Sequence, residues 1–155
     1  MPHAVADTHA VIWYVMADRR LSSRAKAAID DAAAAGDTIL VSGITFVEMV
    51  YLVDKGRIDA ATYEVVLEAL ARPRAVLVEA PVDQGIAQAM RKVPRSEVPE
   101  LGDRVIAATA IAYGVPVISR DGKIRLSSVP TIWQATDGPL RLDGVTVQTC
   151  SVFST

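Results

Sequence analysis

The sequence predicts a single α/β domain in which helices cover both faces of a central, mostly parallel sheet. Short apolar, β-branched segments alternate with helical segments along the chain, and this alternation is typical of a parallel sheet. The strand segments are apolar throughout rather than alternately apolar and polar, which indicates burial on both faces. With 155 residues, 51% of them hydrophobic, the chain is long enough for one packed core, and disorder is not expected.

The first third of the chain predicts two strands and two helices. Residues 3–6 are a short apolar run that ends at an aspartate, and residues 10–16 predict a brief helix. Residues 22–35 are rich in alanine, begin with serines that can cap a helix and stop at Gly36, so they predict a long helix. Residues 38–41 are β-branched and apolar, and they predict a second buried strand.

The middle third predicts three helices and one strand. Residues 42–55 carry apolar side chains at helical spacing. Residues 59–71 predict a helix that stops before Pro73, because proline disfavours helical backbone in the residue that precedes it. Residues 75–78 predict a strand, and residues 82–92 predict the helix that follows it.

The last third predicts an alanine-rich helix and two further strands. Residues 103–113 predict a helix that ends at Gly114. Residues 115–119 predict a strand, residues 122–126 a single helical turn, and residues 131–133 a final short strand.

Residues 134–155 differ from the rest of the chain. They contain Gly138-Pro139, an alternating segment over residues 140–147 and a polar end. This pattern predicts a hairpin or an edge strand followed by a tail, and it suggests no role. We therefore expect a domain over residues 1–133 and a C-terminal extension over residues 134–155.

Composition restricts the classes of function only weakly. The net charge of −2 lacks the positive excess that is typical of nucleic-acid-binding proteins. A local basic rim around an acidic centre would nevertheless suffice to bind RNA. The N-terminal segment has neither the basic start of a signal peptide nor the length of a membrane span, because Asp7 and His9 interrupt it. The single cysteine, Cys150, cannot form an internal disulfide. These features predict a cytoplasmic protein that does not enter a membrane.

Four carboxylates stand where short apolar runs meet helices: Asp7, Glu48, Asp103 and Asp121. The carboxyl ends of parallel strands are where α/β sheets bind ligands. Four acids gathered there would repel one another unless a hard divalent cation neutralised them. Oxygen ligands without histidine or cysteine favour Mg²⁺ or Mn²⁺ over zinc. The pattern therefore predicts a metal-dependent phosphodiesterase.

Each acid also has a simpler explanation when it is taken alone. Asp7 is well placed to cap a helix, Asp103 to favour a helix N-terminus and Asp121 to form a turn. Glu48 is harder to explain, because its neighbours on the predicted helix are apolar and a buried, unpaired glutamate is costly. The joint placement of the four, rather than any one of them, indicates a site.

Three segments of the chain together resemble PIN-domain proteins, and in particular the VapC-type toxins of toxin–antitoxin pairs. These segments are VADTHAVIWYV, VSGITFVEMVYL, and DRVIAATAIAYGVPVISRDGKI with the following VPTIW. The similarity covers roughly residues 3–133. It departs from the family pattern at the C-terminus, where this chain continues for about twenty further residues.

The resemblance implies a PIN-like fold, an Mg²⁺- or Mn²⁺-dependent endoribonuclease activity and the role of a toxin. It implies that Asp7, Glu48, Asp103 and Asp121 form the acidic centre. We expect Asp7 and Asp103 to be direct metal ligands, with the other two acting through water, orienting the nucleophile or holding a second ion. A cognate antitoxin and homodimerisation are likewise implied by the resemblance.

Four further residues are predicted to contact the substrate. The resemblance implies this for Thr8, which follows the first acid, and for Ser119, which precedes the last. Arg120 and Lys123 flank Asp121, where positive charge would bind RNA phosphates. An ordinary solvated basic surface explains these two residues equally well, and it explains a second cluster over residues 91–95 slightly better than RNA binding does.

Two other classes of function remain open at this stage. A PIN-like module without turnover would bind RNA or protein only, yet such a module has no reason to keep mutually repelling acids. A phosphohydrolase or phosphoacceptor that uses a strand-end aspartate as its nucleophile is a third class. It fits less well, because DTHAV lacks a second aspartate two residues after the first.

Overall fold

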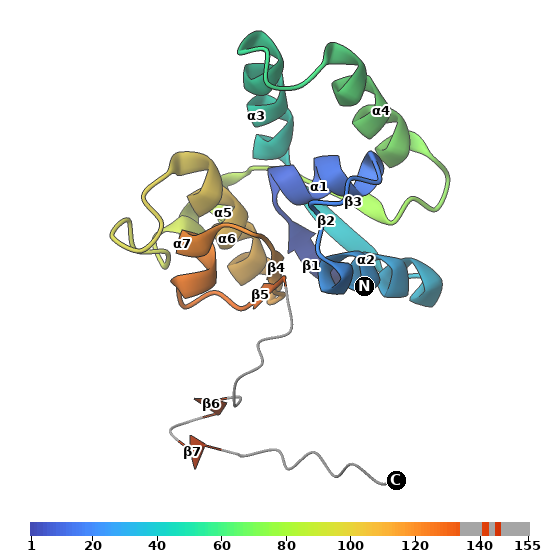
Figure 1. Cartoon of the computed structure of the whole chain (residues 1–155). Coiled ribbons are helices and arrows are strands. Elements are labelled where there is room, and N and C mark those ends of the chain that lie inside the picture. Colours follow the sequence, from blue (N-terminus) through green and yellow to red (C-terminus); the bar gives the residue numbers. More distant parts are fainter. Residues whose placement is uncertain (134–140, 143–144, 147–155) are drawn as a thin grey trace, which may run out of the picture.

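A five-stranded parallel sheet lies at the centre of the molecule (Figure 1). The computed structural model describes residues 1–133, 141–142 and 145–146. The spatial order of the sheet is β3-β2-β1-β4-β5, and all four pairings are parallel. The strands are β1 (Pro2–Ala6), β2 (Thr38–Ser42), β3 (Leu77–Ala80), β4 (Val117–Ile118) and β5 (Thr131–Ile132).

The order of the strands reverses at β1. From β1 the chain adds β2 and β3 on one side, and it later adds β4 and β5 on the other. In parallel α/β sheets, ligands bind beyond the carboxyl ends of the strands at such a reversal. The fold therefore places the ends of β1 and β4, which are neighbours in the sheet, at the natural position for a site.

Helices cover both faces of the sheet, as expected from the sequence. Seven are described: α1 (Thr8–Val15), α2 (Ser23–Ala35), α3 (Gly43–Asp54), α4 (Ala60–Ala71), α5 (Gln84–Met90), α6 (Leu101–Tyr113) and α7 (Gly122–Leu126). Figure 1 shows α3 and α4 together at one end of the molecule, with α5, α6 and α7 grouped on the other side of the sheet.

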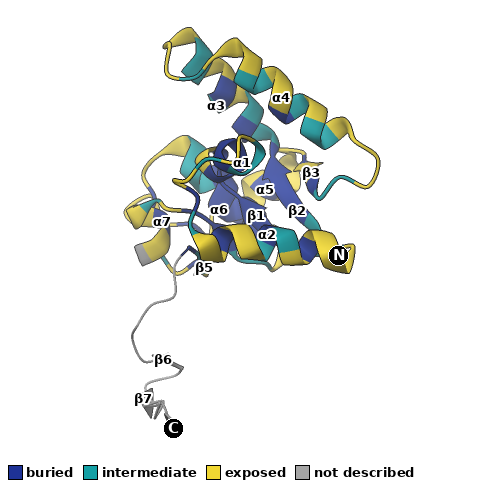
Figure 2. Cartoon of the chain, turned by 45° about the vertical axis from the view of Figure 1, so that its right-hand side comes forward, coloured by how far each residue is buried: buried dark blue, intermediate teal, exposed yellow. Residues whose placement is uncertain are grey.

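The strands bury side chains on both faces, which explains their uninterrupted apolar sequence. Along β1, Ala4 and Ala6 belong to one hydrophobic core, whereas Val5 belongs to the other. In the neighbouring strand β2, Ile39 belongs to the first core and Leu40 to the second. Figure 2 shows the central strands β1 and β2 largely in the colour of buried residues, with exposed residues on the outer faces of the helices. The predicted fold class is thus confirmed.

Helix ends follow the local signals in the sequence. Ser22 caps α2, because its hydroxyl accepts a hydrogen bond of 3.1 Å from the backbone N–H of Ala25 and it also donates to the carbonyl of Trp133. Gly36 ends this helix in the left-handed conformation, with φ of 74°, which glycine adopts without steric cost.

Two boundaries differ from the sequence prediction in ways that affect the interpretation. β3 begins at Leu77, two residues later than expected, after Arg74 with a positive φ of 55°. α6 begins at Leu101 with Glu100 as its N-cap, so Asp103 lies within the first turn and does not open the helix. The alanine-rich pattern marks the helix, but the polar and glycine residues before it conceal its start.

The predicted division of the chain into a domain over residues 1–133 and an extension over residues 134–155 stays a prediction. β6 (Arg141–Leu142) and β7 (Val145–Thr146) form an antiparallel pair. The other residues of 134–155 lie outside the described residues, so the predicted hairpin or edge strand with its tail stays a prediction. No helix in the described part of the chain has both the length and the hydropathy to cross a membrane.

Replacing Ser22 with alanine should lower the free energy of unfolding by about 1–2 kcal/mol, because α2 loses its capping hydroxyl. Urea denaturation followed by circular dichroism measures the change. Ser23→Ala is the matched control: Ser23 is exposed and is the first residue of the helix itself. Equal effects of the two substitutions would contradict the assignment of Ser22 as the cap.

Candidate functional site

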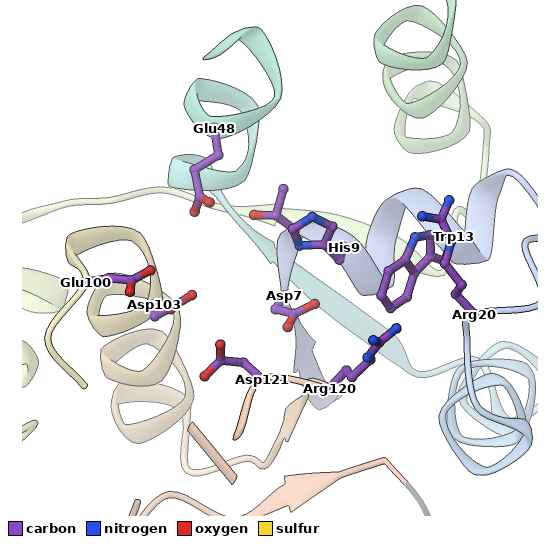
Figure 3. Close-up of a pocket in the computed structure, with 10 residues that line it drawn as sticks. Asp7, His9, Trp13, Arg20, Glu48, Glu100, Asp103, Arg120 and Asp121 are labelled. Atoms are coloured by element: carbon purple, nitrogen blue, oxygen red, sulfur yellow. The ribbon is translucent and has the colours of Figure 1, made fainter. Parts of the chain in front are cut away.

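The four acids singled out in the sequence lie around one cavity at the carboxyl ends of β1 and β4 (Figure 3). The cavity has a volume of about 590 Å³. Its lining residues are Asp7, Thr8, His9, Trp13, Arg20, Glu48, Glu100, Asp103, Arg120 and Asp121. The fold thus brings together residues from β1, α3, α6 and the β4–α7 connection, which are far apart in sequence.

Asp7 is held firmly at the end of β1. Its side chain accepts a hydrogen bond of 2.8 Å from the backbone N–H of Ala10, so it caps α1. Its own N–H donates to the carbonyl of Ile118 in β4. Burial raises the pKa of this carboxyl, and nearby Asp121 adds to the rise, while hydrogen bonds from Ser119 and Ala10 oppose it. Asp7 is therefore both a helix cap and a buried acid that faces other acids.

Glu48 reaches the cavity from α3. Its Oε1 atom is buried and has no hydrogen-bond partner among the described residues. Burial raises the pKa of the Glu48 carboxyl, and the charges of Asp7 and Glu100 raise it further, whereas a hydrogen bond from Thr8 lowers it. A buried carboxylate oxygen without a donor is costly, so this atom is available to an external ligand.

The absence of a side chain at Gly102 permits the position of Glu48. Gly102 lies in the first turn of α6, and a Cβ atom built on it would overlap the Glu48 carboxylate, at 2.8 Å from Cδ. Real Cβ atoms do not approach other atoms this closely. The glutamate therefore lies directly against the N-terminal turn of α6, beside Asp103.

Asp103 has a strongly raised pKa. Partial burial and then the negative charges of Asp121, Glu48, Glu100 and Asp7 raise it from 3.8 to about 7. Repulsion among the gathered charges thus adds to the effect of burial when no cation is bound. Perturbed acids in a cavity are typical of functional sites.

Asp121 ends the connection from β4 and caps α7. Its Oδ1 accepts hydrogen bonds of 2.9 and 3.0 Å from the backbone N–H groups of Lys123 and Ile124. Its own N–H donates to the hydroxyl of Ser119 at 2.9 Å. Asp121 therefore both forms the turn that begins α7 and contributes a carboxylate to the cavity.

A fifth acid, Glu100, was missed by the sequence analysis. It is the N-cap residue of α6 and lines the same cavity. Lys123 forms an ion pair with it at 2.9 Å. Within the described part of the chain, the other four acids form no ion pair with lysine or arginine. The position of Glu100, three residues before Asp103, is a helical spacing that could have indicated it.

The predicted substrate residues fall into two groups. Thr8 and Arg120 line the cavity. Ser119 is fully buried, and its contacts are with Asp7 and Asp121. Lys123 is paired with Glu100 and is not among the lining residues. The substrate roles proposed for these residues stay predictions, and the geometry favours Thr8 and Arg120.

The basic cluster over residues 91–95 lies apart from the cavity, since none of its members lines it. Arg104, next to Asp103 in sequence, also points elsewhere. Its guanidinium donates to the carbonyls of Met90 and Val93 at 3.1 and 3.0 Å, so it ties α6 to the end of α5. Asp103 therefore has no arginine partner from its own helix.

The wall opposite the acids is basic and aromatic. Figure 3 shows His9, Trp13, Arg20 and Arg120 on this side of the cavity. The guanidinium carbon of Arg20 lies 5.2 Å from the Trp13 ring centre, and that of Arg120 lies 5.7 Å from it. The His9 ring contacts the same indole at 5.5 Å. Arg20 lies in the α1–α2 connection, and no pattern in the chain predicted its placement here.

The acids suit a divalent cation, although they do not form a closed cage. As the side chains stand, no three His, Cys, Asp or Glu groups among the described residues converge to hold one metal ion. Mg²⁺ needs no such cage, because it commonly binds one or two carboxylates and keeps several waters. The buried, unpartnered Oε1 of Glu48 and the raised pKa of Asp103 are the features that a cation would relieve. The donor set therefore fits Mg²⁺ or Mn²⁺.

The fold and cavity define an α/β protein with an acidic site at the carboxyl edge of a parallel sheet. Residues 4–129 match the PIN domain family, and the chain belongs to that family. A ribonuclease of Mycobacterium tuberculosis, VapC22, is 28% identical over 136 residues, which is 86% of this chain and 100% of that protein.

Solved structures of low sequence identity share the fold. VapBC2 from Rickettsia felis, bound to a DNA fragment from its promoter, aligns with a TM-score of 0.61 at 16% identity, covering 83% of this chain and 96% of that one. FitAcB from Neisseria gonorrhoeae aligns with a TM-score of 0.53 at 23% sequence identity, and the alignment covers 83% of this chain and 95% of that one. A toxin–antitoxin complex from Klebsiella pneumoniae aligns with a TM-score of 0.52 at 22% identity, covering 76% of this chain and 86% of that one.

Gly102→Ala should change the free energy of unfolding by less than about 0.5 kcal/mol, because the helix preference of alanine is offset by displacement of the Glu48 carboxylate, the far end of a flexible side chain. In a Glu48→Asp background the same change should stabilise the protein by about 0.5–1 kcal/mol, since the shorter side chain leaves room. Urea denaturation of the parent and the three variants measures this coupling. Gly122→Ala is the control: it also lies in a first helical turn, and its Cβ would meet nothing within 4 Å. A stabilisation by Gly102→Ala equal to that of the control would contradict the contact.

Protein freed of metal by EDTA should lose stability as the pH rises from about 4 to about 7. The pKa of Asp103 is 3.8 ordinarily and about 7 in the fold. In this interval the folded state holds a proton that the unfolded state releases, so raising the pH favours unfolding. After allowance for partial exposure, the loss is about 1–2 kcal/mol. Urea denaturation at pH 5 and pH 7.5 measures it.

The control for the pH experiment is Asp103→Asn, which cannot titrate and should show a smaller loss between the two pH values. Asp31→Asn, an exposed position on α2, should behave like the parent. If the parent and Asp103→Asn show the same pH dependence, Asp103 does not carry the raised pKa.

Proposed function

We propose that the protein is a divalent-metal-dependent endoribonuclease that hydrolyses RNA phosphodiester bonds and acts as the toxin of a toxin–antitoxin pair. The observation that carries this proposal is the shared cavity of five carboxylates, one of which has a buried oxygen that receives no hydrogen bond from any described residue. The similarity to the ribonuclease VapC22 supports the choice of RNA, and a basic rim on the opposite wall supports a polyanionic substrate.

The catalytic and metal-binding residues that we propose are Asp7, Glu48, Asp103 and Asp121. Asp7 and Asp103 would hold Mg²⁺ or Mn²⁺ directly, and Glu48 and Asp121 would hold it through water or bind a second ion. When bound, such an ion neutralises phosphate charge and lowers the pKa of a coordinated water.

The protein itself supplies position and charge. The N–H of Ala10 and the nearby Ser119 fix the Asp7 carboxylate, while the backbone of α7 fixes Asp121. Without a bound cation the pKa of Asp103 is about 7, so a metal ion that binds this carboxyl near neutral pH competes with a proton. The Thr8 side chain lines the cavity between the two walls, where we propose that it contacts the substrate.

A cognate antitoxin is the proposed protein partner. The neighbouring solved structures include VapBC2 and a toxin–antitoxin complex. On this chain, α3 exposes Val47, Val50 and Tyr51 beside the helix face that carries Glu48. An amphipathic helix could bury such a face, and a basic side chain from the partner would neutralise the acids. Trp13, by contrast, is buried in the core.

Three further elements of the proposal rest on expectation. We propose that residues 1–133 are the nuclease domain, supported by the family match over residues 4–129. We also propose homodimerisation, and a cytoplasmic location where RNA is accessible. The C-terminal extension over residues 134–155 has no assigned function.

Asp7→Asn and Asp103→Asn should each reduce the rate of RNA cleavage by about 100-fold or more, because each removes a carboxylate from the metal site. Cleavage of a structured RNA by the purified protein with Mg²⁺ or Mn²⁺ measures this, and EDTA should abolish it. Asn at position 7 retains the capping oxygen, so the variant should remain folded. Asp31→Asn on α2 is the matched control.

Calorimetry separates this proposal from a PIN-like module that binds RNA or protein without turnover. The parent should bind Mn²⁺, and Asp103→Asn should bind it at least tenfold more weakly. Full cleavage by both asparagine variants would refute the acidic centre. A parent that neither binds Mn²⁺ nor cleaves RNA would support the inert module.

A further inference from the structure

We infer that Arg20 and Arg120, both held against the ring of Trp13, form a phosphate-binding clamp for the single-stranded RNA segment next to the bond that is cut. We call these two residues the arginine clamp. The inference rests on the proposed nuclease function and adds to it the residues that hold the substrate. It also assigns a role to Arg20, for which the sequence offered no motif.

Trp13 supplies the fixed support of the clamp. Its side chain is only 7% exposed and packs in the core, against Trp133 among others. Both guanidinium groups lie within 6 Å of its ring centre, at 5.2 Å for Arg20 and 5.7 Å for Arg120. Cation–π attraction of this kind restrains a long, flexible side chain. Two separate connections, α1–α2 and β4–α7, therefore present their positive charges at one place.

Arg20 is further oriented by Asp18. The Arg20 Nε and Nη2 atoms donate to the two carboxylate oxygens of Asp18 at 3.1 and 2.7 Å, and the Arg20 backbone N–H donates to the same carboxylate at 2.9 Å. The side chain is nevertheless 63% exposed. Its remaining N–H groups are thus pre-oriented at the rim of the cavity, which reduces the entropy that an incoming phosphate must overcome.

Arg120 is the more available member of the clamp. It is exposed, and within the described residues it forms neither an ion pair nor a side-chain hydrogen bond to a carboxylate. Lys123, the other cation near Asp121, is not among the residues that line the cavity, and its single ammonium group is paired with Glu100. A free guanidinium presents planar donors that match two phosphate oxygens, so Arg120 is better suited than Lys123 to bind a phosphodiester.

The arrangement of charges indicates which ligand fits. The acids occupy one wall of the cavity and the arginine clamp the other (Figure 3). A ligand that spans both walls needs two negative groups. One must coordinate the metal ion at the acidic wall, and the other must reach the arginine clamp on the far side of the same cavity. Successive phosphates of a single RNA strand meet this requirement. An acidic protein segment meets it less well, because its carboxylates would repeat the charge that already crowds the acidic wall.

The test measures binding of a fluorescein-labelled, 20-nucleotide single-stranded RNA by fluorescence anisotropy in EDTA, from 50 to 300 mM KCl. EDTA prevents metal-dependent cleavage of the probe. Arg20→Ala and Arg120→Ala should each weaken binding roughly tenfold. The logarithm of the association constant falls as the logarithm of the salt concentration rises, and each substitution should make this negative slope shallower by about 0.7, the value for one lost phosphate contact on a single strand. The double variant should make it shallower by about 1.4.

Arg24→Ala is the matched control, because Arg24 is an exposed arginine on α2 that lines no described cavity. It should leave affinity and slope unchanged. Thermal unfolding should show that all variants remain folded. Parent-like affinity and slope in both clamp variants, or an equal loss in the control, would overturn the inference. Loss of antitoxin binding without loss of RNA binding would also overturn it and would assign the clamp to a protein contact.

A cleavage assay with Mg²⁺ separates this inference from the proposed function. The clamp variants should raise KM about tenfold and change kcat less than threefold, whereas Asp103→Asn should chiefly lower kcat. If the parent does not cleave RNA, the proposed function fails, but the binding experiment still decides the role of the clamp. A fall in kcat with unchanged KM in the clamp variants would contradict a binding role.

Discussion

Repulsion among carboxylates at one edge of the sheet is the constraint on which the site depends. Five acids line one cavity, and four of them have no lysine or arginine partner within the described part of the chain. Partial burial and, after it, the charges of the neighbouring acids raise the pKa of Asp103 to about 7. A fold that keeps such a cluster loses stability unless something positive enters it. The packed sheet and its two cores supply the stability that this requires.

Structural and functional explanations for the acids are not alternatives in this protein. Asp7 caps α1 and Asp121 caps α7, as each would if it had no other role. The same backbone N–H groups that satisfy one oxygen hold the carboxylate in place in the cavity. Capping therefore positions the site, and it accounts for acids at the junctions between strands and helices. The two arginines on the opposite wall are restrained in a comparable way, by the buried indole of Trp13.

Much of the fold and part of the site could be predicted from the sequence, for identifiable reasons. Runs that are apolar on both faces, such as Ile39–Val41, indicate a buried parallel strand because no polar alternation interrupts them. Asp7 could be found because it directly follows such a strand, and Asp121 because it lies within three residues of the end of one. Glu100 was missed because it precedes its helix in a loop-like segment. The contact between Gly102 and Glu48 joins α6 to α3, and no local pattern encodes it.

Local patterns in the chain are sufficient to predict the alternation of strands and helices, the residues that end them and the acids that follow β1 and β4, because these depend on neighbours within a few positions. The folded structure was needed to show which acids share a cavity, that Lys123 pairs with Glu100 and that Arg20 and Arg120 lie against the same Trp13 ring. Those outcomes depend on the order of strands in the sheet and on side chains that meet across large separations in sequence. Charge interactions of this kind are set by distance in space, and distance in the chain does not reveal them.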